Sequence, residues 1–289
     1  MKYLFINLII FISFKSFSQG PYNSLCWTIT GNELNDTSYI YGTFHSQDNR
    51  VFQFQNGVEE AFDNAAVYAM ELNMDSLDRS KMMAAMLMDS GQSLQSLLSK
   101  KDYKTVNKFF LDSLGISLFM FNKMQPILTT QFVVTKDLNK EQQNALDFYW
   151  FKEAKSQGKQ LVGLETMEEQ VNAFKTIPVE AQAKELVKAV KEYGKKEEFD
   201  MNSMLEIYTS GNLDSLMVMI NSSSSKSSIS MEEFNEAFLY NRNINMANRV
   251  EQYIVKKSVF MAVGAAHLPG KNGVIELLRN KGYKVEPLN

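Results

Sequence analysis

Only two histidines occur in this chain of 289 residues, and each ends the same four-residue pattern, Gly-x-x-His. The patterns run from Gly42 to His45 and from Gly264 to His267, and each follows a short apolar run that is typical of a β-strand. Imidazole is the commonest metal ligand in proteins and the usual general base near neutral pH. The glycine lets the backbone turn and leaves space beside the strand end. We therefore expect the fold to bring His45 and His267 to one functional site, although two structural histidines that cap turns would show the same pattern.

The composition narrows the classes of protein that this chain can belong to. Hydrophobic residues make up 45% and charged residues 22%, which is ordinary for a folded protein with a large core. The formal net charge of −3 gives no basic field for nucleic acid, so we expect no nucleic-acid partner. Cys26 is the single cysteine, which excludes an intramolecular disulfide, and its apolar surroundings favour a buried, inert thiol.

The first 18 residues have the pattern of a secretory signal peptide. A basic start at Lys2 precedes an apolar stretch from Tyr3 to Phe14, and the small residues Ser16 and Ser18 fit a cleavage site. A retained anchor is the alternative, but the apolar run is shorter than the ~20 residues that span a bilayer. We expect cleavage after Ser18, export to the periplasm or the extracellular space, and no transmembrane segment in the mature chain.

The rest of the chain divides into strand-rich ends and a helical middle. Two blocks share the plan strand, Gly-x-x-His, helix, strand. We expect an α/β (α+β) fold in which two similar halves build a central mixed β-sheet and a large helical insert lies between them. The expected boundaries are a core of residues 25–75, 160–175 and 231–289, an insert of about 76–159 and 176–220, and a flexible polar loop at 221–228.

Two glutamates stand where predicted strands end. Glu71 follows the apolar strand 66–70, and Glu165 follows the strand 161–164. Because active sites of α/β folds gather at the carboxyl ends of strands, both carboxylates are expected at the edge that carries the histidines. Alone, each is equally consistent with a helix N-terminal charge or a salt bridge. Together with the histidines they form a His₂Glu₂ set that suits Mn²⁺, Co²⁺ or Zn²⁺.

Two further observations come from the residues alone: the presence of Arg242 and the absence of several known catalytic motifs. Arg242 is a candidate clamp for an oxyanion or a carboxylate, with a structural ion pair as the equal alternative. The sequence contains no His-Glu-x-x-His, no Gly-x-Ser-x-Gly, no phosphate-binding glycine loop and no zinc-binding cysteines. If the histidines bind no metal, one of them can serve as a base and the other as a stabiliser.

These features occur in a fixed order: Tyr39–His45, the strand that ends at Glu71, Gly163–Thr166 with Glu169 and Gln170, Asn241–Asn243, Val263–Gly270, and a tail from Gly273 to Val285. The ordered set resembles the TraB/GumN family and covers nearly the whole mature chain. Eukaryotic Tiki proteins, which are described as divalent-metal-dependent proteases, are similar. Erythromycin esterase and the haem-binding ChaN proteins are more distant relatives with the same core.

The resemblance implies an exported metal-dependent hydrolase, most simply a Tiki-like metallopeptidase that acts on a peptide or protein. It implies that His45, Glu71 and His267 hold or adjoin the metal, with Mn²⁺ or Co²⁺ favoured and Zn²⁺ also suited. Glu165 would be a further ligand or the general base, and Arg242 would steady the tetrahedral oxyanion. A metal-independent esterase and a non-catalytic envelope protein that binds a peptide or haem are the alternatives.

Overall fold

The computed structural model describes residues 22–134, 136, 145–194, 201–223 and 229–288. The predicted signal peptide and its cleavage site lie outside the described residues. Within the described residues, no helix has the length and apolar character needed to cross a membrane.

A single mixed sheet of six strands forms the centre of the molecule, in the order β4-β3-β5-β2-β1-β6. Strand β5 lies between β2 and β3 and is parallel to both, and β4 is parallel to β3. Strand β1 is antiparallel to its neighbours β2 and β6. This arrangement confirms the α/β class and the mixed sheet. The strands are β1 (Cys26–Thr30), β2 (Ser38–Thr43), β3 (Val67–Leu72), β4 (Gln160–Glu165), β5 (Val259–Gly264) and β6 (Lys284–Pro287).

The strand register places the two Gly-x-x-His patterns side by side. Thr43 of β2 is paired with Gly264 of β5, so the two patterns leave neighbouring parallel strands at the same edge. On the other side of β5, Leu72 of β3 is paired with Glu165 of β4. The carboxyl ends of four parallel neighbours, β4, β3, β5 and β2, therefore form one continuous edge of the sheet.

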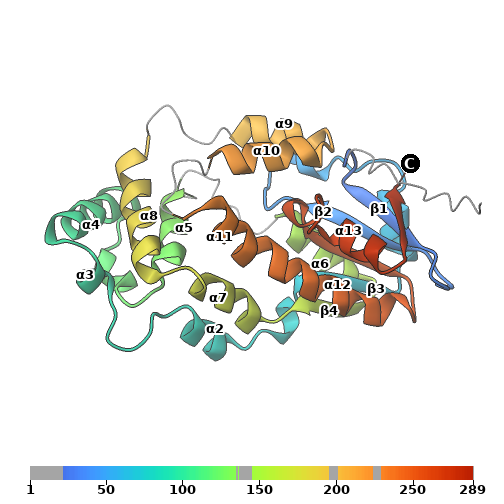
Figure 1. Ribbon diagram of the computed structural model, residues 1–289, viewed down its shortest axis with the longest axis horizontal. Helices are drawn as coiled ribbons and strands as arrows, with labels where there is room; N and C mark the ends of the chain where they lie inside the picture. The colour runs from blue at the N-terminus through green and yellow to red at the C-terminus, as the bar shows by residue number, and fades with distance from the viewer. Residues whose placement is uncertain (1–21, 135, 137–144, 195–200, 224–228, 289) are drawn as a thin grey trace, which may run out of the picture.

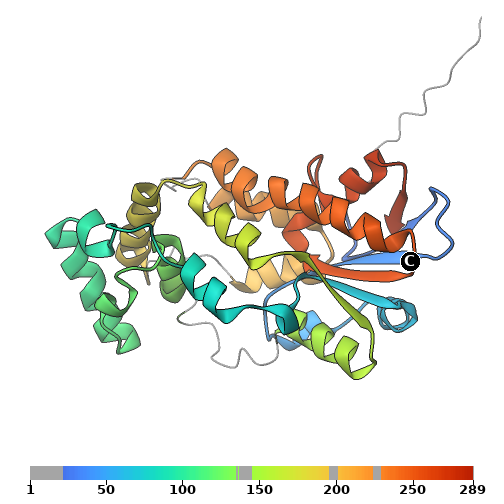
Figure 2. The same cartoon turned by 90° about the horizontal axis from the view of Figure 1, so that it is seen from below.

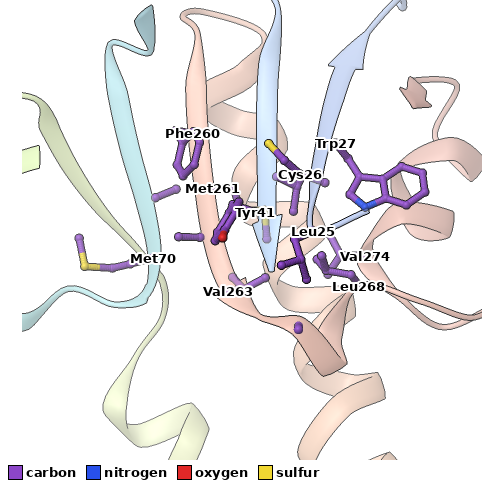
Figure 3. Packing of buried hydrophobic residues seen from close by; sticks show 14 of the residues in the cluster. Leu25, Cys26, Trp27, Tyr41, Met70, Phe260, Met261, Val263, Leu268 and Val274 are labelled. Atoms are coloured by element: carbon purple, nitrogen blue, oxygen red, sulfur yellow. The ribbon is translucent and has the colours of Figure 1, made fainter. Parts of the chain in front are cut away.

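Helices cover both faces of the sheet. Helices α1 (Val58–Asn64) and α6 (Leu146–Ser156) pack on one face, where the rings of Phe62, Trp150 and Phe260 have centroids 4.5 to 5.3 Å apart. Helices α12 (Asn241–Ile254) and α13 (Val274–Asn280) lie on the opposite face. Figure 2 shows the sheet between α12 and α6, and Figure 3 shows Tyr41 and Phe260 among the side chains of this core.

A second, smaller helical unit has its own core and lies apart from the sheet at the left of Figure 1. Val106, Phe110, Leu118 and Leu186 are fully buried in it. All of its elements fall within the residues expected as the helical insert. Its elements are α3 (Leu94–Leu97), α4 (Lys100–Leu114), the 3-10 turn η3 (Leu118–Phe121), α5 (Pro126–Val134) and α8 (Val179–Glu192).

Three helices from the residues expected as the insert pack against the sheet. Trp150 of α6, Tyr208 of α9 (Met201–Thr209) and Leu213 of α10 (Leu213–Ser223) are buried in the core around the sheet, not in the helical unit. The helical period reveals that a helix has an apolar face, but it does not identify the surface that this face packs against. Of the predicted polar loop 221–228, the first three residues belong to α10, and residues 224–228 lie outside the described residues.

The remaining elements are short connections and the helices that lead into the site. They are η1 (Asn49–Phe52), η2 (Met74–Ser76), α2 (Arg79–Ala85), α7 (Met167–Lys175), α11 (Met231–Asn235), the π-helical turn η5 (Glu236–Tyr240) and η6 (Ala265–His267).

Candidate functional site

Both histidines stand at the carboxyl edge of the sheet, in different surroundings. The side chain of His45, just after β2, is 70% exposed, whereas that of His267, in η6, is only 6% exposed. The charge of His45 lies close enough to affect the pKa values of both Glu71 and His267. The fold thus brings the two histidines to one region around Glu71.

The glycines of the two patterns provide space, not a left-handed turn. Neither Gly42 nor Gly264 has a positive φ. A Cβ atom on Gly42 would lie 2.9 Å from a methyl carbon of Leu268, and one on Gly264 would lie 3.3 Å from Oε1 of Glu71. The expectation that glycine leaves space at the strand end is confirmed. Neither glycine adopts a backbone conformation that other residues avoid. The bare backbone of Gly264 also donates its N–H to Oε1 of Glu71 at 2.8 Å.

His267 is held between an amide and a carboxylate. Its Nδ1 lies 2.6 Å from Oδ1 of Asn243, and its Nε2 lies 3.8 Å from Oε1 of Glu71. Burial disfavours the imidazolium and lowers the pKa of His267 to about 4, against the pull of Glu71. His267 is therefore neutral at pH 7 and has one unprotonated ring nitrogen.

Glu71 is ionised although it is largely buried. Its Oε1 accepts the Gly264 N–H, and its Oε2 accepts a hydrogen bond of 2.8 Å from Nη2 of Arg242. Burial by itself would raise the pKa of Glu71, but two positive charges outweigh it and lower the pKa to about 2: that of His267, which is protonated only in acid, and that of Arg242. A permanent negative charge therefore sits beside the buried histidine.

Arg242 joins the two strand-end glutamates. Its Nε lies 2.9 Å from Oε1 of Glu165, its Nη2 lies 2.5 Å from Oε2 of Glu165, and its Nη1 donates to the carbonyl of Phe238 at 3.1 Å. The side chain of Glu165 is fully buried and also accepts a hydrogen bond of 3.1 Å from Nε2 of Gln170. Phe238 belongs to η5, and π-helical turns are frequent at functional sites. Whether Glu165 and Arg242 touch a substrate stays a prediction, since each is bonded to protein groups here.

Asp147 is a site residue that sequence reasoning missed. Its Oδ2 lies 2.5 Å from Nδ1 of His45, and its Oδ1 accepts a hydrogen bond of 2.5 Å from the hydroxyl of Thr43. The hydrogen bond with Asp147 raises the pKa of His45 to about 9. Aspartate is common in the first turn of a helix because its negative charge interacts favourably with the helix dipole. The position of Asp147 in the sequence therefore gave no separate indication of a functional role.

We expect this pair to make stability depend on pH. Because the pKa of His45 rises from 6.5 in the unfolded chain to about 9, its contribution is complete below pH 6.5 and is lost as the pH rises through 9. Urea unfolding between pH 6 and 9.5 should show this loss in the wild type and a flatter profile in Asp147→Asn. Asp75→Asn, which alters an exposed ion pair with Lys155, is the matched control and should keep the wild-type slope. Equal slopes in the wild type and Asp147→Asn would contradict the assignment.

The donor set is of the right kind for a divalent cation. His45 and His267 each engage Nδ1 with an oxygen of Asp147 or Asn243, which is how metal-binding histidines are commonly oriented. Glu71 adds a carboxylate. In the described part of the chain, however, no group of three His, Cys, Asp or Glu side chains is already arranged to hold a metal ion. The chemistry of the donors fits, and the side chain of His45 is exposed enough to change its orientation.

The sequence profile of the TraB/PrgY/gumN family matches residues 25–287. The chain belongs to this family. Among its relatives, zebrafish (Danio rerio) "Metalloprotease TIKI2" is 25% identical over 94% of this chain and 62% of its own length. Zebrafish "Metalloprotease TIKI1" is 26% identical over 93% of this chain and 64% of its own length. The human (Homo sapiens) "Metalloprotease TIKI1" is 24% identical over 93% and 62%.

These matches confirm the resemblance stated from the residues and support a metallopeptidase-like family. The chain spans less than two thirds of the length of these relatives. No solved structure matches the chain significantly.

Proposed function

We propose that this protein is an exported, metal-dependent hydrolase of the peptidase type, in which His45, Glu71 and His267 hold a divalent cation. The observation that carries the proposal is the pairing of β2 with β5, which sets the two Gly-x-x-His patterns side by side next to Glu71. The relatives named metalloprotease support the same class. Their names also support a peptide or protein as substrate.

The donors limit which cation is suitable. Imidazole nitrogen with carboxylate oxygen suits Mn²⁺, Co²⁺ or Zn²⁺, and the resemblance favours the first two. A bound cation of this kind lowers the pKa of a water molecule and polarises a scissile carbonyl. The chain's own contribution is to keep Glu71 ionised and His267 neutral at pH 7. Because a ligating imidazole nitrogen carries no proton, His45, whose pKa is raised to about 9, would release a proton when the cation binds.

Arg242 and Glu165 are proposed to act by positioning Glu71. Nη2 of Arg242 donates hydrogen bonds to both Glu71 and Glu165. The buried Glu165 therefore holds the guanidinium in place, and the guanidinium in turn orients Glu71. Gln170 donates to the same two carboxylates, at 3.1 Å to Glu165 and 3.5 Å to Glu71. The roles of general base for Glu165 and oxyanion clamp for Arg242 would require these groups to leave their present bonds.

Hydrolysis of a mixture of fluorescence-quenched peptides tests the proposal. The protein is stripped with a strong chelator, dialysed, and assayed with and without added MnCl₂ or CoCl₂. We expect no cleavage in the stripped protein and recovery with Mn²⁺ or Co²⁺. Undiminished cleavage in the presence of the chelator would overturn the metal-dependent assignment.

A metal-independent hydrolase is the second candidate, and the opposite pKa shifts of the histidines favour it. Near pH 7 the pKa of about 9 keeps His45 protonated, while the pKa of about 4 keeps His267 neutral. Environments that move the pKa values of two titratable groups in opposite directions are typical of a general acid and general base pair. Chelator-resistant hydrolysis of p-nitrophenyl esters, lost in His267→Ala, would select this candidate over the first.

A further inference from the structure

We propose that Asn243 is a positioning residue that fixes the tautomer of His267, with the hydrogen on Nδ1 and the lone pair on Nε2. The use of that lone pair as a metal ligand rests on the proposed function. The hydrogen on Nδ1 follows from the contacts of Asn243 alone.

The orientation of the Asn243 amide is set by its second partner. Nδ2 of Asn243 lies 2.8 Å from the backbone carbonyl oxygen of Asn272, which can only accept a hydrogen bond. If the amide were turned over, two acceptor oxygens would face each other at this distance with no hydrogen between them. The amide nitrogen therefore faces Asn272, and the amide oxygen faces His267.

The orientation of the amide decides the protonation of the ring. Oδ1 of Asn243 is an acceptor and lies 2.6 Å from Nδ1 of His267, so Nδ1 carries the hydrogen. Among the residues that the structure describes, the ring has one other polar contact, between Nε2 and Oε1 of Glu71, and at 3.8 Å it is too long to be a hydrogen bond. A neutral imidazole with a hydrogen on Nδ1 has its lone pair on Nε2.

The lone pair then faces a negative oxygen. Nε2 of His267 and Oε1 of Glu71 present electron density to the same space, and no hydrogen lies between them. A divalent cation bound between these two atoms would satisfy both of them, in line with the proposed function. Asn243 thus prepares His267 as a ligand in advance, as the outer partners of metal-binding histidines do in general.

Helix α12 serves both members of this pair through consecutive residues. Arg242 bonds to Glu71, and Asn243, which is 1% exposed, bonds to His267. If Asn243 were merely structural, its amide would hold the loop at Asn272, and the His267 ring could carry its hydrogen on either nitrogen. The two roles differ in what they predict for the histidine ring nitrogens.

Nitrogen NMR of the metal-free, ¹⁵N-histidine-labelled protein at pH 7 tests the proposal directly. The chain has only two histidines, so the spectrum contains two rings, and His45→Gln identifies the exposed one. We expect the His267 ring to have a protonated Nδ1 and an unprotonated Nε2. A hydrogen on Nε2 of His267 in the wild type would overturn the proposal, and this measurement needs no variant that must fold.

Asn243→Leu adds a second readout. We expect Nε2–H to become populated in the His267 ring and the affinity for Mn²⁺, measured by calorimetry, to fall about 10- to 100-fold. Asn245→Leu is the matched control because Asn245 is an exposed residue of the same helix, and it should match the wild type. An unchanged ring spectrum in folded Asn243→Leu would contradict the positioning role. Wild-type protein with the expected tautomer but no Mn²⁺ binding would instead count against the metal site and leave the role of Asn243 intact.

Discussion

His45→Ala is expected to lower metal-stimulated peptide hydrolysis at least about 100-fold, because it removes a ligand or an acid–base group from the reacting centre. The side chain of His45 is 70% exposed, so its removal opens no cavity in the core. The thermal midpoint should therefore stay close to that of the wild type above pH 9, where the pair with Asp147 no longer contributes to stability. A loss of activity without a loss of folding is the pattern that identifies a catalytic role.

His267→Ala should lose activity to the same extent and should also be less stable, since the buried ring is the partner of Asn243. Lys155→Ala, which breaks an exposed ion pair on α6, is the control and should keep full activity. Activity equal to that of the wild type in both histidine variants would exclude the site as the reacting centre.

Arg242→Met is expected to reduce the free energy of unfolding by about 3–5 kcal/mol, the usual cost of leaving a buried charge without its partner. The guanidinium is only 15% exposed and compensates two carboxylates, of which Glu165 is fully buried. Urea unfolding at pH 7 measures the change. In the double variant Arg242→Met/Glu165→Gln one uncompensated charge is gone, so part of the lost stability should return.

Arg249→Met is the matched control for this prediction. Arg249 lies on the same helix and pairs with Glu169, but both side chains are about one third exposed, at 30% and 32%. A pair so exposed contributes about 1 kcal/mol or less. If Arg242→Met and Arg249→Met lost equal stability, Arg242 would not be the central counter-charge of the site.

The strand ends were predictable from the sequence, and so were the residues placed there. Apolar runs followed by Gly-x-x-His or by glutamate located His45, His267, Glu71 and Glu165, because strand boundaries depend mainly on local pattern. The strand that carries Glu71 continues one residue beyond it, to Leu72. The common edge followed from the rule that sites gather at the carboxyl ends of parallel strands.

The partners of these residues could not be predicted, because they depend on packing between distant elements. Asp147 reaches His45 only because α6 lies on the sheet, and its sequence context resembled that of an ordinary helix start. Asn243 stood in the recognised Asn241–Asn243 segment without an assigned role, since only the fold reveals the carbonyl of Asn272 beside it. Which surface each helix of the expected insert packs against depends on distant contacts in the same way.

A crystal structure with Mn²⁺, with data collected to locate the metal by its anomalous signal, would show whether His45, Glu71 and His267 share one cation. We expect one peak at the carboxyl edge of the sheet, about 2 Å from Nε2 of both His45 and His267 and from a carboxylate oxygen of Glu71. Crystals of His267→Ala grown and treated in the same way should show no peak there. If saturating Mn²⁺ left this edge empty in the wild type, or if the peak contacted neither histidine, the proposed metal site would be wrong.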